Sequence, residues 1–231
     1  MPRPTTPLLS QAGIRAAALE IIDTEGLDGL SMRKLAAALS VSAPALYFHY
    51  PTKEQLLDDV ASEIMEKVDT GDFVIGWREG LLGWARSYRA ALAEHPNIVP
   101  FLARGPGQRD ASLRRADAIH GGLVAAGWPA REATMIGAST KYLVVGAAMG
   151  SFSRGFVDDV QVYLDRYPAL GDAHRLREHA DAVDRDSFEF ALSMFVDGLA
   201  ARLGRISPSA GAAARSAPPA PATGASPPDP R

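Results

Sequence analysis

Helix start and stop signals follow one another at short intervals between Ser31 and Thr52, and they limit what this part of the chain can fold into. Ser31 is a good N-cap for one short helix, because its hydroxyl can accept a hydrogen bond from an amide of the first turn. Ser42 is expected to cap a second helix with its hydroxyl, and Pro44 just beyond it is typical of a first turn, since a proline there has no amide that needs a partner. Pro51 ends that helix, and Thr52 with a glutamine three residues later fits a capping box. The segment is therefore predicted to form two short helices joined by a tight turn, followed by a further helix.

Apolar residues at helical spacing predict the other elements. A first helix is expected over about residues 10–25, with Gly26 just beyond its end, and its apolar stripe comprises Ile14, Ala17, Ala18, Ile21 and Ile22. The helix that Thr52 opens has the apolar face Leu56, Leu57, Val60, Ala61, Ile64 and Val68. Further helices are predicted over residues 77–94, 97–104, 109–126, 130–154 and 185–203, with connections at 69–76 and 156–183. No stretch shows convincing strand alternation, so the predicted fold class is all-α.

The composition is that of a folded protein. The chain has 231 residues, 47% of them hydrophobic, which is ample for a packed core. It has no cysteine and no apolar secretory segment at its N-terminus, so a cytoplasmic location without disulfides is expected. Residues 207–231 are almost wholly Ala, Pro, Ser and Gly, and this tail is predicted to be disordered because it cannot bury enough apolar surface to offset its ordering entropy.

Convincing motifs for catalysis, metal binding or membrane insertion are missing. None of the five histidines has a partner four residues away, the spacing that puts two imidazoles on one helical face, so no metal site is predicted. The stretch from Gly105 to Asp110 lacks the third glycine of a dinucleotide loop and is read as a turn. Asp158 and Asp159 are read as solvated surface. The most apolar window, residues 133–151, carries Lys141 at its centre, which disfavours a membrane span.

The segment from Leu30 to Lys53 carries Arg33, Lys34 and Lys53 but no Asp or Glu, although the whole chain has a formal net charge of −3. Two short helices joined by a tight turn have the lengths of a helix-turn-helix, whose second helix enters the major groove of DNA. Carboxylates on that face would repel the phosphates, which gives their absence a direct cause. A solvated surface with a few lysines is the alternative if charge alone is considered.

The sequence "GLDGLSMRKLAAALSVSAPALYFHYPTKEQLLDDV" resembles the N-terminal signature of the TetR family of one-component repressors. The likeness covers Ile14 to about Ile64 and includes "RKLA" on one predicted helix and "LYFHY" on the next. Two further stretches, Trp77 to Pro96 and Phe188 to Leu199, are similar to the C-terminal domain of the tetracycline-repressor branch. The resemblance implies a homodimer in which three small helices read double-stranded DNA and a larger helical body binds a small-molecule effector.

These expectations divide the chain into a helix-turn-helix DNA-binding domain (residues 1–51), a connecting helix (52–68), a ligand-binding and dimerisation domain (69–206) and the tail (207–231). Family analogy places the dimer interface in the helices at 130–154 and 185–203. Composition agrees, because the small-residue run "VVGAAMGS" allows close helix packing.

The DNA-binding roles of the family carry over to Arg33, Ala43, Pro44, Ala45, Tyr47, Phe48, His49 and Lys53. Arg33 would reach a base or a phosphate, and its guanidinium fork suits guanine. Ala43 to Ala45 stand where other family members have polar residues, and small apolar groups can pack on thymine methyls but donate no hydrogen bonds. Base readout is therefore expected to depend heavily on Arg33 and on DNA shape. Tyr47, His49 and Lys53 would contact phosphates, Lys53 at a helix N-terminus where its charge adds to that of the dipole.

Neighbouring positions in the same segment leave alternatives open. Phe48 matches an aromatic position that either touches DNA or packs internally. Leu46 is expected in the core. Ser40 replaces the glycine that many relatives have in the turn, so the turn either needs no left-handed residue or tolerates a strained one.

Candidates for lining an effector pocket are aromatic and polar residues of the body: Trp84, Tyr88, Phe101, Arg104, His120 and Tyr142. Each of them could alternatively be ordinary core or surface. Alignment with tetracycline-binding relatives puts Phe101 where these carry the histidine that coordinates the magnesium of the drug. A phenylalanine cannot bind a metal, so a tetracycline–magnesium effector is not expected. Trp84, Tyr88 and Phe101 favour an aromatic or apolar molecule instead, with Arg104 available for an anionic group.

The predicted function is a ligand-responsive transcriptional regulator, foremost a repressor that an effector releases from a palindromic operator, and not an enzyme. The ligand would favour one conformation of the protein and so move the helix at 52–68, which joins the ligand pocket to the DNA-binding helices. The competing hypothesis is a helical ligand-binding or enzymatic dimer without DNA-binding activity. The acidic net charge slightly favours this alternative, and the combination of Arg33, Tyr47, His49 and Lys53 opposes it.

Overall fold

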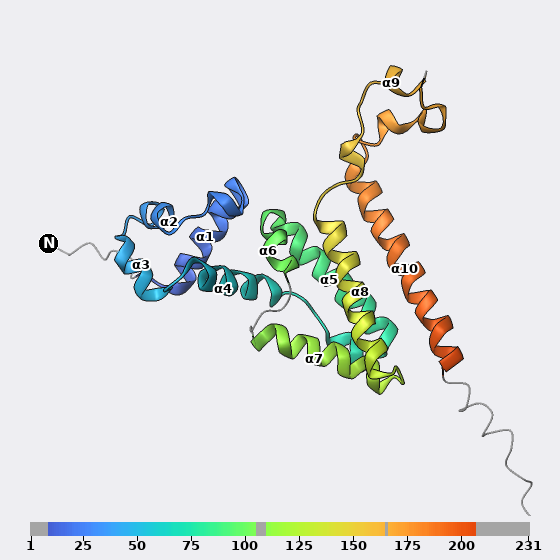
Figure 1. The fold of residues 1–231 in the computed structure, drawn as a ribbon, viewed down its shortest axis with the longest axis horizontal. Helices are drawn as coiled ribbons and strands as arrows, with labels where there is room; N and C mark the ends of the chain where they lie inside the picture. The colour runs from blue at the N-terminus through green and yellow to red at the C-terminus, as the bar shows by residue number, and fades with distance from the viewer. Residues whose placement is uncertain (1–8, 105–109, 165, 207–231) are drawn as a thin grey trace, which may run out of the picture.

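A computed structural model describes residues 9–104, 110–164 and 166–206, and all regular secondary structure in these ranges is helical (Figure 1). The N-terminal helices are α1 (Gln11–Glu25), α2 (Met32–Ala38), α3 (Ala43–His49) and α4 (Lys53–Met65). The body contains α5 (Trp77–Glu94), α6 (Val99–Ala103), α7 (Asp110–Ala125), α8 (Ala130–Ala148), α9 (Gln161–Leu164) and α10 (Ala180–Ile206). The all-α prediction is confirmed, while the predicted turn at 105–109 and the predicted tail at 207–231 lie outside the described residues.

The N-terminal helices begin where the capping residues place them. The Ser10 hydroxyl accepts a hydrogen bond from the Gly13 amide (3.1 Å), and the Thr52 hydroxyl accepts one from the Gln55 amide (3.1 Å). Ser31 caps α2 in the same way, at 3.2 Å from the amide three residues later. Each cap satisfies an amide that the first turn of its helix leaves without a partner.

Ser42 does not cap α3 with its side chain, and this expectation was wrong. The residue stands at the N-cap position, but its hydroxyl makes no capping hydrogen bond. An N-cap side chain bonds the second or third amide of the helix. In α3 the second position is Pro44, which has no amide hydrogen. The amide of Ala45, at the third position, already donates to the Ser42 carbonyl at 3.0 Å. The proline that marks the start of the helix therefore also removes a donor for its cap.

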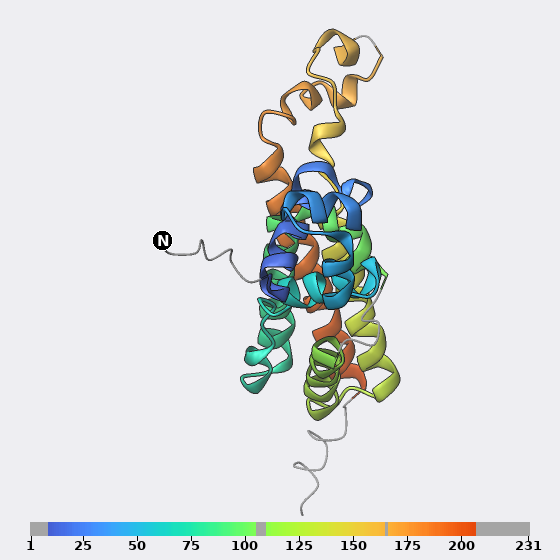
Figure 2. The same cartoon turned by 90° about the vertical axis from the view of Figure 1, so that its left-hand side faces the viewer.

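The molecule has a small N-terminal group of helices, α1 to α3, which α4 joins to a larger helical body (Figure 1). Figure 2 looks along this axis, with α1 to α3 in front of the body. In the body, α5 packs against α7, α8 and α10, and α8 and α10 lie beside each other. One continuous cluster of buried hydrophobic residues runs from the N-terminal group into the body.

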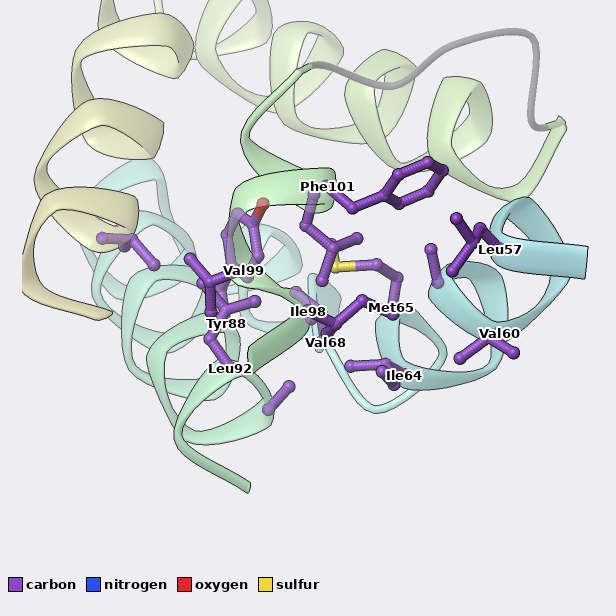
Figure 3. Packing of buried hydrophobic residues seen from close by; sticks show 14 of the residues in the cluster. Leu57, Val60, Ile64, Met65, Val68, Tyr88, Leu92, Ile98, Val99 and Phe101 are labelled. Atoms are coloured by element: carbon purple, nitrogen blue, oxygen red, sulfur yellow. The ribbon is translucent and has the colours of Figure 1, made fainter. Parts of the chain in front are cut away.

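The predicted apolar face of α4 is fully used. Its six predicted members, and Met65 in addition, are buried. Figure 3 shows this face meeting the body: Leu57, Ile64, Met65 and Val68 lie opposite Ile98 and Phe101, at the junction between α5 and α6. The two parts of the chain are therefore joined by apolar packing as well as by chain connectivity.

The segment at 69–76 is more than a linker. It forms a 3-10 turn at Gly71–Val74, from which the Phe73 ring packs between α5 and α7. A Cβ at Gly80 would lie 2.4 Å from this ring, and one at Gly122 would lie 2.5 Å from it. These two glycines let the ring approach both helices closely, so the connection is anchored in the body.

The long C-terminal helices differ in their limits from the sequence prediction. Helix α8 ends at Ala148 rather than at 154, where Met149 and Gly150 follow and glycine is a poor helix former. Helix α10 begins at Ala180, whose side chain is buried, and continues to Ile206. Between them the chain forms an arm with α9 and several 3-10 turns that extends past the ends of both helices (Figure 1). Within the arm, the Tyr163 hydroxyl donates to the Val157 carbonyl at 3.0 Å.

Candidate DNA interface and effector-binding body

The turn between α2 and α3 contains a left-handed residue. Ser40 has a φ of 55°, the only positive φ of a non-glycine residue in the described ranges. The chain then folds back so that the Val41 amide donates to the Ala36 carbonyl at 3.0 Å. Of the two alternatives for this turn, the structure therefore has the one in which a strained residue is tolerated. The turn sets the direction in which α3 leaves α2.

Helices α2 and α3 present a mostly exposed surface at the end of the molecule remote from α10 (Figure 1). Arg33 and Pro44 are exposed, Tyr47 is 48% exposed, and Phe48 is 86% exposed. Phe48 therefore does not pack in the core of this chain, and its ring contacts His49 edge-on at 5.6 Å. Ala43, Ala45 and His49 are half-buried. Leu46 has no exposed surface, which confirms its predicted place in the core.

Lys53 is held inside the N-terminal group. Its Nζ donates to the Leu30 carbonyl at 2.6 Å and to the Leu27 carbonyl at 3.1 Å, and the side chain is half-buried. An ammonium group has three protons, so two of them are used within the domain and one is left for another acceptor. Lys53 fastens the chain before α2 to the start of α4. No local pattern in the sequence indicates this internal role.

A polar network that sequence reasoning missed fixes the end of α3. The hydroxyl of the buried Tyr50 donates to Asp59 of α4 at 3.0 Å, and Arg15 of α1 donates to the same hydroxyl at 3.4 Å. Arg15 also pairs with Glu63 at 2.7 Å, and these two partners raise the pKa of the Arg15 guanidinium. Burial is the main cause that raises the pKa of Tyr50 above its usual value. The network holds α1, the end of α3 and α4 in one arrangement.

A second set of bonds joins the N-terminal group to the body. The Asn97 side chain donates to the Ile22 carbonyl at 3.0 Å and to the Asp23 carbonyl at 2.9 Å, which are at the C-terminal end of α1. His95 Nδ1 lies 2.9 Å from the Asp23 carboxylate. The Ile22 carbonyl also accepts from the Gly26 amide at 2.8 Å, and Asn97 provides a donor for the Asp23 carbonyl at the end of the helix. The body is therefore connected to the N-terminal group by these contacts as well as by helix α4.

The predicted effector residues fall into groups in the structure. Trp84 and Tyr88 are buried neighbours on α5, with stacked rings 6.3 Å apart, and the buried Nε1 of Trp84 has no hydrogen-bond partner. Phe101 is buried on α6, and its ring points toward α4 (Figure 3). Arg104 lies over the Phe101 ring at 5.6 Å, but its side chain is exposed and 3.9 Å from the Glu54 carboxylate.

The remaining two candidates lie apart from these. His120 on α7 is half-buried, and its Nε2 is 3.1 Å from the Ala130 carbonyl at the start of α8. Tyr142 is 73% exposed on α8 and borders a groove of about 420 Å³ between α8 and α10, with Phe152 and Phe188. The structure thus does not bring Tyr142 together with the aromatic pair on α5.

Among the described residues, His, Asp and Glu side chains form no group of three that could hold a metal ion. Within the same ranges, every helix is too short or too polar to cross a bilayer.

The comparison with protein-family models matches nearly all of the helical part of the chain. Residues 14–60 match the bacterial regulatory proteins of the tetR family, and residues 74–203 match the tetracyclin repressor-like C-terminal domain. This chain belongs to the TetR family. Residues 61–73, between the two matches, contain the end of α4 and most of the 3-10 turn at Gly71–Val74.

Curated relatives within the TetR family agree with this assignment. An HTH-type transcriptional regulator of Saccharopolyspora erythraea is 33% identical over 198 residues, covering 84% of this chain and 78% of the relative. The class A tetracycline repressor protein from transposon 1721 of Escherichia coli is 33% identical over 208 residues, covering 85% and 93%. Members of the TetR family are DNA-binding, ligand-responsive transcriptional regulators and not enzymes.

A solved TetR family structure gives the same fold. The protein ActR of Streptomyces coelicolor, in complex with actinorhodin, superposes with a TM-score of 0.65 and 25% identity. The superposition covers 85% of this chain and 99% of ActR. The small N-terminal group and the larger helical body are thus the two parts of a TetR family regulator.

Proposed function

We propose that this protein is a dimeric repressor that binds a near-palindromic operator and leaves it when a small aromatic or apolar effector occupies the body. The observation that carries the proposal is the exposed surface of α2 and α3. It includes Arg33, Tyr47 and Phe48, and the chain from Leu30 to Lys53 has no carboxylate that would repel phosphates. The Phe48 ring is 86% exposed and the adjacent Tyr47 is 48% exposed, so both side chains of α3 are accessible to DNA.

On this proposal, α3 is the recognition helix. Arg33 reads a base or binds a phosphate next to it, and the small residues Ala43, Pro44 and Ala45 allow close approach to thymine methyls. Tyr47 and His49 bind phosphates. Phe48 contacts DNA rather than the core, which its exposure supports.

Lys53 has a double role in the proposal. Its ammonium holds the carbonyls of Leu27 and Leu30 and brings one positive charge to the N-terminus of α4. Charge and helix dipole act together on a phosphate there, and the third proton of the ammonium is available to it.

A second copy of the chain would supply the second recognition helix. Helices α8 and α10 carry exposed large hydrophobic side chains that a partner would cover, namely Met135, Tyr142, Phe190 and Met194. A twofold axis through this face would produce a pair of α3 helices. One turn of DNA separates such half-sites by about 34 to 36 Å, so the operator would be a near-palindrome.

The effector is proposed to bind near Trp84, Tyr88 and Phe101. Two stacked rings and a third apolar ring suit an aromatic or apolar molecule, and the unpaired Nε1 of Trp84 suits one acceptor atom on it. ActR binds actinorhodin, and relatives are named tetracycline repressors. The phenylalanine at 101 argues against a magnesium-bound drug, because it offers no metal ligand.

The decisive experiment is selection of bound DNA from a random pool with the full-length protein, repeated in the presence of candidate aromatic effectors. The expected result is a near-palindromic sequence whose enrichment falls when an effector is present. Failure to enrich any sequence, together with DNA binding that does not change with salt, would favour a ligand-binding dimer without DNA-binding activity.

Effector binding is tested by a thermal-shift screen. Compounds that raise the Tm of the wild-type protein should lose this effect in Trp84→Ala and Phe101→Ala. If both variants keep the full shift, the effector does not bind at these rings.

A further inference from the structure

A cavity lies at the end of α5, beside the α5–α6 junction. Its volume is about 390 Å³, within the range of small-molecule sites, and it is bounded by the end of α5, the end of α8 and the start of α10. One wall is made of small residues, Ala93, Ala147, Ala148 and Gly150. Trp84, Tyr88 and Phe101 do not line this cavity, so it is separate from the proposed effector cluster.

The charged residues of the cavity leave one cation without an anion. Arg154 pairs with Asp181 at 2.7 Å. Arg185 pairs at 3.1 Å with the aspartate that follows it. Asp184 accepts a hydrogen bond from Ser153 at 3.3 Å. Arg89, by contrast, makes no hydrogen bond or ion pair with any part of the chain that the structure describes, and its Nε is buried without a partner.

The surroundings of Arg89 prepare it for a planar anion. The central carbon of its guanidinium lies over the ring of the buried Phe188, 4.9 Å from the ring centroid. Such a cation–π contact uses none of the N–H donors of the guanidinium. A carboxylate can accept two parallel hydrogen bonds from a guanidinium. A partly buried arginine without such an acceptor leaves the desolvation of its Nε–H uncompensated.

We propose that this cavity binds a small molecule with a carboxylate group, which pairs with Arg89 while its apolar part lies on the wall of small residues. With Arg154 paired to Asp181 and Arg185 paired to Asp186, Arg89 and Asp184 are the two lining charges without an ion pair among the described residues, and the carboxylate would bind at Arg89.

The cavity borders the contact between the body and the N-terminal group. Pro96 lines the cavity, and its two chain neighbours, His95 and Asn97, hold the C-terminal end of α1. A ligand that shifts Pro96 must therefore change the bonds to the Ile22 and Asp23 carbonyls. Occupancy of the cavity is thus coupled to the position of α1. This coupling rests on the proposed DNA-binding role of the N-terminal group, whereas binding itself does not.

Binding of benzoate and of its uncharged analogue benzamide to the full-length protein is measured by calorimetry without DNA. Benzoate should bind saturably, and Arg89→Gln should weaken it by about tenfold or more, as expected for loss of a charge-assisted pair. Arg86→Gln is the matched control, because Arg86 is on the same helix, pairs with Glu189 and does not line the cavity. Benzamide should bind about tenfold more weakly than benzoate.

A second pair of variants guards against misfolding of the arginine variant. Ala93 is exposed and lines the cavity, so Ala93→Phe should block benzoate, whereas Ala90→Phe, at an exposed position of the same helix outside the cavity, should not. Wild-type affinity in both Arg89→Gln and Ala93→Phe would overturn the site. So would equal binding of benzamide, or no saturable binding of benzoate up to about 10 mM. Binding of inorganic phosphate in place of benzoate would overturn the choice of a carboxylate.

Coupling between the cavity and α1 is measured by amide hydrogen exchange in residues 20–26. Benzoate should change the exchange of these amides in the wild-type protein and leave them unchanged in Asn97→Ala, which removes the donors to α1. If benzoate binds but exchange in this segment stays the same, the coupling is overturned while the site stands. Both results are independent of whether an operator is found, so they are distinguishable from failure of the proposed function.

Discussion

At the scale of single residues, Arg33 is the side chain on which base recognition is expected to depend, since Ala43 to Ala45 donate no side-chain hydrogen bonds. We predict that Arg33→Ala weakens binding to the selected operator by about 1 to 3 kcal/mol and relaxes the preference at one base pair. Quantitative binding to the operator and to random DNA measures this. Arg131→Ala, at an exposed arginine of α8, is the control. Equal losses on both DNAs would make Arg33 a phosphate contact.

Lys53 combines a structural and an electrostatic role, and the two can be separated. Lys53→Ala removes hydrogen bonds from a charged donor to the carbonyls of Leu27 and Leu30, so we expect a loss of about 1.5 to 3 kcal/mol in the free energy of unfolding. It should also weaken binding to all DNA sequences and lower the salt slope by about one.

Denaturant unfolding and a salt titration of DNA binding test the two roles of Lys53 separately. Lys67→Ala is the control, because Lys67 forms an exposed pair with Glu94 that solvent screens. An unchanged salt slope in Lys53→Ala would remove Lys53 from the DNA contacts and leave its structural role.

At the scale of elements, the turn between α2 and α3 stores strain in one residue. Ser40 has a left-handed backbone, which costs a residue with a Cβ about 1 to 2 kcal/mol and costs glycine little. Replacing Ser40 by glycine would remove this strain, but part of the stability gained is lost because glycine is more flexible in the unfolded chain. We therefore expect Ser40→Gly to stabilise the protein by up to about 1 kcal/mol.

Thermal and denaturant unfolding measure the effect of Ser40→Gly. The matched control is Ala37→Gly at an exposed position of α2, which should destabilise by about 0.5 to 1 kcal/mol because glycine weakens a helix interior. If both variants lower stability equally, the backbone at Ser40 is not strained.

The elements also show how far local signals reach. The caps Ser31 and Thr52 and the apolar faces of α1 and α4 placed the N-terminal helices closely, because each signal acts within one or two turns. Ser42 failed as a cap because Pro44 and the Ala45 amide left its hydroxyl without a donor. The limits of α8 and α10 were missed because contacts between distant segments, such as Ser153 with Asp184, shape the chain there.

At the scale of the whole molecule, the proposed dimer links the body to DNA recognition. Phe190 is 69% exposed on α10, and a carboxylate there would have to be desolvated in the interface. Phe190→Asp is expected to convert the dimer to a monomer in sedimentation equilibrium. It should also lower operator affinity, because two half-sites would then be bound separately.

The control for this variant is Val74→Asp, which places a carboxylate at a 92% exposed apolar position in the 3-10 turn at Gly71–Val74 rather than on α8 or α10. It should leave the oligomeric state unchanged. A dimer that persists in Phe190→Asp would place the interface elsewhere.

Most of the fold and the family assignment follow from the sequence by itself. Capping residues, helix spacing and the segment free of carboxylates act locally, and together they determine an all-helical chain with a helix-turn-helix at its start. Comparison with the family models confirms this, matching residues 14–60 and 74–203. Arg33 and Tyr47, which the sequence offered as DNA contacts, are exposed, and Phe48, which the sequence left between DNA contact and internal packing, is exposed as well.

Only the tertiary structure decided which side chains meet across long separations in the chain. It placed Lys53 on the carbonyls of Leu27 and Leu30, joined Asn97 to the end of α1, and left Arg89 without an anion beside a cavity. Such contacts depend on how whole helices pack, and that packing is set by many small apolar contributions rather than by a local pattern. A sequence can therefore indicate which residues are candidates for DNA contact, but not which contacts join the body to them.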